Sequence, residues 1–144
     1  MHKTILASLF LLAACSNSSE PLNAAFAGTW TGTVSYAGSL TGIGYQGRMV
    51  TTVDGNSLLA TDICLGSEKG GGTLILTGSE NSASWSGSYQ CPATVITGCF
   101  SFVVTYTRAT ATLSGTTLAV IASGTSNACG TSGDITITFI GAQG

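Results

Sequence analysis

The sequence has few charges and almost no histidine. Charged residues make up 7% of its 144 residues, with four lysines and arginines against six aspartates and glutamates, so the formal net charge is −2. The only histidine is His2. Because so few cations cannot form a basic patch, we expect no nucleic-acid partner. Serine, threonine, glycine and asparagine must provide most of the hydrated surface.

The shortage of histidine also restricts catalytic chemistry. With His2 at the extreme N-terminus, we expect no Ser-His-Asp triad, Cys-His pair or histidine-ligated metal site in the folded domain. Lys69 precedes three glycines, a context typical of a solvated turn. In principle, Asp62 with Glu68 or Asp54 with Asp134 could form an acid–base pair. No pattern brings two of them together, so we expect a non-enzymatic protein with no catalytic residue, metal site or cofactor.

The N-terminal fifteen residues have the features of a secretion signal. Lys3 provides a positive charge, and the apolar run of residues 5–12 follows it. This run is too short to span a bilayer as a stable helix. Small residues come next, and Cys15 stands directly after Leu-Ala-Ala, an order that resembles the lipobox of bacterial lipoproteins.

The lipobox resemblance implies a lipid anchor and a location in the bacterial envelope. Residues 1–14 would be the signal peptide, and Cys15 would become the acylated first residue, in contact with the membrane through its acyl chains. Two or three chains on one cysteine anchor a protein stably, whereas a single chain binds marginally. Ser16 replaces the aspartate that retains lipoproteins at the inner membrane, which favours the outer membrane. The alternative is an ordinary cleaved signal peptide followed by an incidental cysteine.

Four more cysteines indicate structural disulfides. They are Cys64, Cys91, Cys99 and Cys129. None belongs to a C-x-x-C pair, so the usual ligand geometry of a four-thiolate metal site is missing. The secretion route leads to an oxidising compartment, where an even number of cysteines predicts two disulfides.

Three pairings of these cysteines are possible. We favour Cys91–Cys99, because these residues flank the loop of an expected hairpin, together with Cys64–Cys129. The second bridge would close a long loop and contribute about 4 kcal/mol on the chain-entropy model. The alternative is Cys64–Cys91 with Cys99–Cys129.

The rest of the chain divides into a tether and one domain. Residues 15–25 are expected to form the lipidated N-terminus and a flexible tether, because they are polar and contain breakers. In residues 26–144, apolar and polar residues alternate with period two, without a helical segment. The segment Asp54-Gly55-Asn56 predicts a hairpin turn. The expected strands are residues 29–36, 43–53, 57–65, 73–77, 82–89, 100–106, 109–113, 117–121 and 134–140.

Eight or nine short strands joined by tight turns predict an all-β domain. Exposed strand edges are hazardous in a chain that is rich in threonine, valine and isoleucine and poor in charge. Closure of the sheet removes such edges. We therefore expect an antiparallel up-and-down β-barrel of about eight strands, with a β-sandwich as the alternative.

Two motifs in these strands are Gly28-Thr29-Trp30 and, at residues 85–89, Trp-Ser-Gly-Ser-Tyr. The first is similar to the Gly-x-Trp that begins the first strand of lipocalins, and the second resembles a later strand of the related avidins. The resemblance implies a lipocalin-like (calycin) barrel. Lipocalins carry an arginine near the last strand, whereas several expected strands follow Arg108. Gly32 takes the place of an avidin asparagine that binds biotin, so biotin binding is not implied.

The interior of such a barrel is the candidate ligand site. The aromatic residues expected to line it are Trp30, Tyr36, Tyr45, Trp85 and Tyr89. An eight-stranded barrel is just wide enough either to be filled by side chains or to hold one small ligand. We expect binding of a small apolar ligand or an envelope component, and the alternative is that these aromatics form a packed core.

Two other functions stay open. The protein could act through protein contacts, including protease inhibition by the tail of residues 16–25 or contacts through the glycine- and threonine-rich segment 122–133, expected to be a loop. It could also be a structural surface lipoprotein. The sequence indicates no particular protein partner.

Overall fold

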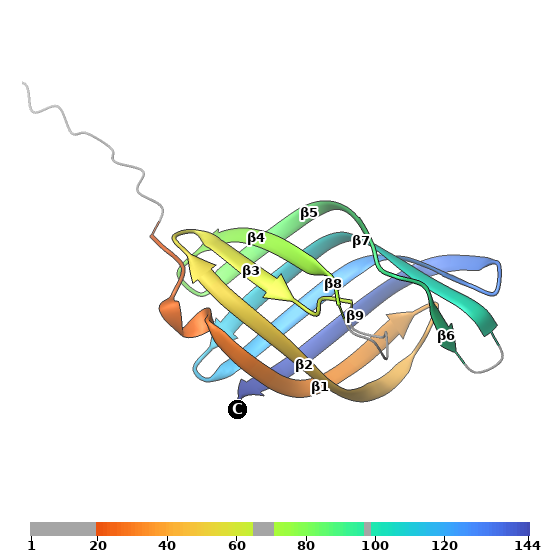
Figure 1. Ribbon diagram of the computed structural model, residues 1–144, viewed down its shortest axis with the longest axis horizontal. Coiled ribbons are helices and arrows are strands. Elements are labelled where there is room, and N and C mark those ends of the chain that lie inside the picture. Colours follow the sequence, from red (N-terminus) through yellow and green to blue (C-terminus); the bar gives the residue numbers. More distant parts are fainter. Residues whose placement is uncertain (1–19, 65–70, 97–98) are drawn as a thin grey trace, which may run out of the picture.

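The alternating residues form nine strands in the described part of the chain, and these strands make one continuous sheet (Figure 1). The computed structural model describes residues 20–64, 71–96 and 99–144, and of residues 42, 43, 45, 95, 96, 99 and 100 only the backbone. The elements are η1 (Ala24–Phe26), β1 (Gly28–Gly38), β2 (Gly42–Asp54), β3 (Ser57–Thr61), β4 (Thr73–Ser79), β5 (Ser82–Gln90), β6 (Thr94–Ile96), β7 (Cys99–Ser114), β8 (Thr117–Ala128) and β9 (Thr131–Gln143).

The sheet closes into a barrel. Strands β1 to β5 pair in sequence, β5 pairs with β7, and β7, β8 and β9 lead back to β1, so that eight antiparallel strands form the wall. The short strand β6 pairs with β7 and stands outside this ring. The predicted all-β class and up-and-down barrel are confirmed, and the sandwich alternative is wrong. The architecture is consistent with a calycin-like fold.

Strand β7 joins two of the expected strands into one. Buried positions change from even to odd numbers between Tyr106 and Ala109. The strand nevertheless continues, because one extra residue at Thr107 shifts the register between the pairs Tyr106↔Gly124 and Arg108↔Ser123. This bulge lets Tyr106 and Ala109 both point into the core.

The segment 122–133 is mostly strand. Strands β8 and β9 occupy it except for a turn at Cys129 and Gly130, whose φ angles are 52° and 81°. Gly124 lies within β8, at a point where this strand passes close to β7. A Cβ at this position would collide with the Thr105 carbonyl oxygen of β7. The expected loop is therefore wrong, because this glycine serves the close approach of two strands.

Inward-facing side chains from every strand of the wall fill the interior. The largest fully buried ones are Trp30, Tyr106, Phe26, Phe139, Met49, Leu58, Ile63, Leu76, Leu118, Ile135, Ile137 and Val34. A Cβ at Gly47 would lie 2.7 Å from Val34 Cγ2 and 3.5 Å from the Phe139 ring, so side chains occupy the space beside this glycine. The described interior is a packed core.

The residues before β1 close one end of the barrel. The Leu22 N–H donates to the Gly55 carbonyl oxygen at 3.0 Å, and the Asn23 N–H donates to the Glu80 carbonyl oxygen at 2.7 Å. The side chain of Leu22 is buried, and that of Phe26 is fully buried. The described part of the expected tether thus packs against the barrel.

One disulfide joins Cys64 and Cys91, whose Cα atoms are 5.6 Å apart. The favoured pairing of Cys91 with Cys99, and of Cys64 with Cys129, is therefore wrong. Cys99 pairs with Ile96 of β6, whereas the Cys91 N–H donates to the Val104 carbonyl oxygen, farther along β7. Cys91 is thus displaced from Cys99 and meets the segment that follows β3.

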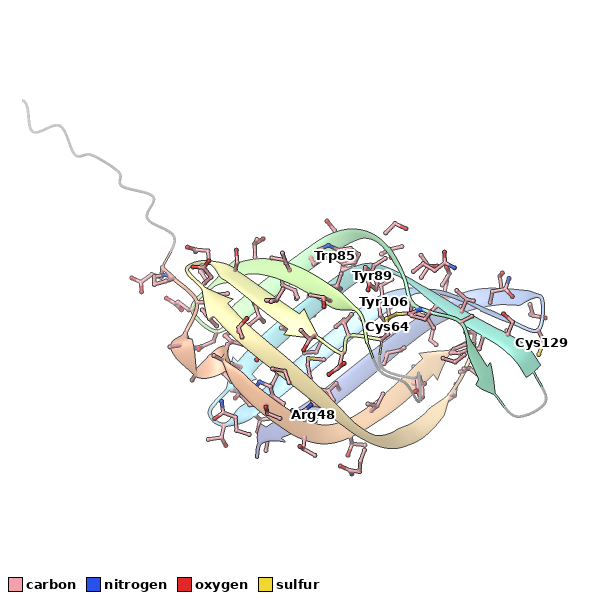
Figure 2. The ribbon with its side chains drawn as sticks, viewed as in Figure 1. Arg48, Cys64, Trp85, Tyr89, Tyr106 and Cys129 are labelled. Carbon is pink, nitrogen blue, oxygen red and sulfur yellow. A yellow bond between two sulfur atoms is a disulfide. The ribbon has the colours of Figure 1, made fainter. Side chains whose placement is uncertain are left out.

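Cys129 also forms a disulfide, and its partner lies outside the described side chains. Its N–H donates to the Ser101 carbonyl oxygen at 3.2 Å, which brings it beside the start of β7. Figure 2 shows Cys129 at the end of the molecule, well away from Cys64. The alternative pairing Cys99–Cys129 stays a prediction.

Candidate functional site

Trp30 belongs to the core at the capped end of the barrel. Its side chain is fully buried, and its Nε1–H donates to Thr51 Oγ1 at 2.8 Å. The Thr51 hydroxyl in turn donates to the Phe26 carbonyl oxygen. This chain of hydrogen bonds ties β1, β2 and η1 together and uses the only polar atom of the indole.

The tyrosines lie toward the other end. Tyr36 and Tyr89 are partly buried and pack against the core. The Tyr89 hydroxyl accepts a hydrogen bond from the Thr73 N–H at 3.3 Å. The side chain of Tyr45 lies outside the described residues. Tyr106, which was not among the predicted site residues, is fully buried opposite Tyr89.

Trp85 lies where two strands of the wall separate. Strands β4 and β5 pair near their turn, from Ser79↔Ser82 to Thr77↔Ser84, and beyond these residues both strands continue without pairing to each other. The Tyr89–Thr73 contact bridges the separation farther on. The wall therefore has a lateral gap between β4 and β5.

Local features of both strands explain this gap. At the turn, a Cβ on Gly78 would collide with the Ser82 carbonyl oxygen, so glycine permits the close approach there. Farther along, the register of β5 against β7 shifts between Ser86 and Tyr89. Such a shift bends a strand, which here is β5 just beyond Trp85.

An outward-facing depression of about 420 Å³ lies over the gap, and we term it the Trp85 groove. Its lining residues are Ile75, Thr77, Ser84, Trp85, Ser86 and Arg108. Ile75 alternates with the buried Leu74 and Leu76 and is 57% exposed. Trp85 is partly buried, because it packs against the core as well as lining the groove.

The indole of Trp85 lies across the next glycine of its own strand. A Cβ at Gly87 would be 2.8 Å from Trp85 Cζ2. A larger side chain at this position would displace the ring. The Trp-Ser-Gly sequence thus supplies the tryptophan, a hydroxyl at the groove and the space for the ring.

Arg108 provides the charge of the groove. It is exposed on β7 directly opposite Ser86. Among the described residues it forms neither a salt bridge nor a hydrogen bond through its guanidinium group. The other five lining residues are uncharged. An aromatic surface, an exposed alkyl side chain, three hydroxyls and a free guanidinium can together recognise an amphipathic anion.

The sequence predicted one of the six groove residues, Trp85, and placed it inside the barrel. The sequence suggested no site role for Arg108, which only failed to match the arginine that lipocalins carry near their last strand. One signal was present: Arg108 follows directly after the bulge of β7, at the change in the alternation. That it lies near β4 depends on the β5–β7 pairing, which no local pattern indicates.

Comparison with known proteins leaves the fold and the groove as the grounds for assigning a function. The chain matches no protein-family model, and neither a curated protein nor a solved structure is significantly similar to it. In the described ranges, no helix is long and apolar enough to cross a membrane. Those ranges also contain no group of histidine, cysteine or acidic side chains suited to a metal ion.

Proposed function

We propose that this protein is a non-enzymatic binding module of the bacterial envelope and that it holds its ligand in the Trp85 groove. The observation that carries the proposal is the partly exposed indole beside Ile75 and Arg108. Trp85 and the exposed Ile75 line the same depression, and a concave apolar surface with a few polar groups is the usual form of a ligand site.

The outer wall is a better location for the ligand than the interior. Trp30, Met49 and Phe139 are fully buried among their neighbours. A ligand in that region would have to displace close-packed side chains, which costs free energy. The groove needs no such displacement.

The anchor we propose is the acylated Cys15 at the outer membrane. Six residues, 16–21, separate it from the buried Leu22, so the chain from Cys15 to Leu22 can span about 25 Å at most. The capped end of the barrel would therefore stay close to the lipid headgroups, with the groove on the side wall.

Replacing Cys15 with serine should release the full chain from the membrane. The serine variant cannot carry the thioether-linked lipid, and the binding contributed by its acyl chains is lost. Membrane fractionation and the mass of the intact protein measure the effect, with Ser16→Ala as the matched control that stays acylated. A serine variant that remains membrane-bound would contradict lipid anchoring.

Native and denaturing mass spectrometry test ligand binding. The full chain, extracted from bacterial membranes in mild detergent, is expected to retain a non-covalent mass in the native spectrum. That mass should be lost from the Arg108→Gln variant and kept by Arg48→Gln, whose arginine lies on β2 away from Trp85 (Figure 2). No retained mass in the unaltered protein would contradict the proposal.

A protein-contact function is the second candidate. Ile121 on β8 and Ile140 on β9 are 43% and 54% exposed on neighbouring strands. Strands β1, β8 and β9 together contain a single charged residue, Asp134. This uncharged outer face favours contact with another protein. Inhibition by the N-terminal tail is less favoured, because Leu22 is buried against the barrel.

A further inference from the structure

We infer that the ligand of the Trp85 groove is an anionic saccharide, bound with its ring on the indole of Trp85 and its acidic group on Arg108. The inference rests on the proposed function and names the class of ligand.

The charge of the groove selects for an anion. Of the described residues that line the groove, only Arg108 is charged, and the described carboxylates do not line it. A guanidinium group presents a planar fork of N–H donors that matches a carboxylate or a phosphate. Because Arg108 has no acidic partner among the described residues, an anion would find the guanidinium available.

The remaining lining residues suit a sugar ring. Trp85 offers a flat apolar surface, on which the C–H face of a pyranose can pack, and Ile75 extends that surface. Thr77, Ser84 and Ser86 carry hydroxyls, which can donate as well as accept hydrogen bonds and so match the hydroxyls of a sugar.

An acyl chain fits these residues less well. Three of the six lining residues carry hydroxyls, and covering them with a hydrocarbon would remove their hydration without replacing their hydrogen bonds. An extended peptide that adds a strand to a free edge is also disfavoured. The gap is bounded by the Thr77↔Ser84 pair and by the Tyr89–Thr73 contact, so a strand cannot run through it.

Three sugars with the same ring provide the test: N-acetylmuramic acid, N-acetylglucosamine 6-phosphate and neutral N-acetylglucosamine. Each is titrated into the full chain in detergent while tryptophan fluorescence is recorded. We expect at least one acidic sugar to bind about tenfold or more tightly than the neutral one, since hydrogen bonds to a charged group are the stronger ones. Which acidic sugar binds distinguishes a carboxylate ligand from a phosphate ligand.

Two variants locate the interaction. Arg108→Gln should abolish the preference for the acidic sugar, whereas Arg48→Gln, the matched exposed arginine, should leave it unchanged. Trp85→Phe should remove most of the fluorescence response, because the remaining Trp30 is fully buried. Equal binding of neutral and acidic sugars, or an Arg108→Gln variant that keeps the preference, would overturn the inference.

The failure of the inference can be distinguished from the failure of the proposed function. If no sugar binds but the native spectrum still shows a retained mass that depends on Arg108, the groove binds another class of ligand. A change in the fluorescence of Trp85 on addition of phosphatidylglycerol vesicles, but not of neutral vesicles, would then identify a lipid headgroup. If no sugar binds and no mass is retained, both proposals fail.

Discussion

Replacing Trp30 with alanine is expected to lower the free energy of unfolding by about 3–5 kcal/mol. The side chain is fully buried at the capped end of the barrel, so its removal leaves a cavity among packed neighbours. The Thr51 hydroxyl also loses the hydrogen bond that it accepts from the indole N–H. Denaturant unfolding followed by circular dichroism measures the loss.

Two controls separate the parts of this effect. Trp30→Phe keeps most of the volume and removes the N–H, and it should cost about 1–3 kcal/mol. Trp85→Ala removes the same kind of side chain from a partly exposed position and should cost less than Trp30→Ala. Equal losses at the two tryptophans would mean that Trp30 is not the core residue described above.

Removal of the Cys64–Cys91 disulfide is also expected to lower the free energy of unfolding strongly. Its cysteines are 27 residues apart, and on the chain-entropy model the bridge contributes about 3–4 kcal/mol by restricting the unfolded chain. The Cys64→Ala/Cys91→Ala double variant should therefore unfold at a clearly lower denaturant concentration.

The pairing itself is checked by peptide mapping of the unaltered protein under non-reducing conditions. The expected product links the peptide of Cys64 to that of Cys91. A peptide that links Cys64 to Cys129 would contradict the structure. A single Cys64→Ala substitution is the control, and it should destabilise the protein about as much as the double variant, because either change breaks the same bridge.

The wall of the barrel could be predicted because the alternation of apolar and polar residues in each strand shows which side chains face inward. Trp30 and Val34 alternate with exposed threonines along β1, and the Asp54-Gly55-Asn56 segment does form the turn between β2 and β3. The sequence also shows the change in the alternation of apolar and polar residues after Tyr106. Whether such a change marks a turn or a bulge depends on the partner strands, since β5 and β8 both pair across that point.

The site could not be predicted, because two tryptophans in similar local sequences have different surroundings. Trp30 lies between threonines and Trp85 between serines, and each is followed two residues later by glycine. Trp30 is covered because β1 pairs on both sides there, whereas β4 and β5 separate beside Trp85. The separation arises from pairing between distant segments.

The favoured pairing of the cysteines was wrong for a related reason. The nearest pair in the sequence, Cys91 and Cys99, was favoured because a hairpin was expected between them. The short strand β6 pairs its Ile96 with Cys99, and Cys91 lies opposite Val104. Proximity in the chain was therefore a poor guide to proximity of the sulfur atoms.

The most direct test of the account is the nitrogen–proton NMR spectrum of the two indole groups, recorded while a muramidase digest of bacterial cell wall is added to the full chain. The account predicts that the Trp85 peak shifts, whereas the Trp30 peak stays in place, because its N–H is buried and bonded to Thr51. A shift of the Trp30 peak with the Trp85 peak unmoved would put the ligand inside the barrel and contradict the outer-wall site.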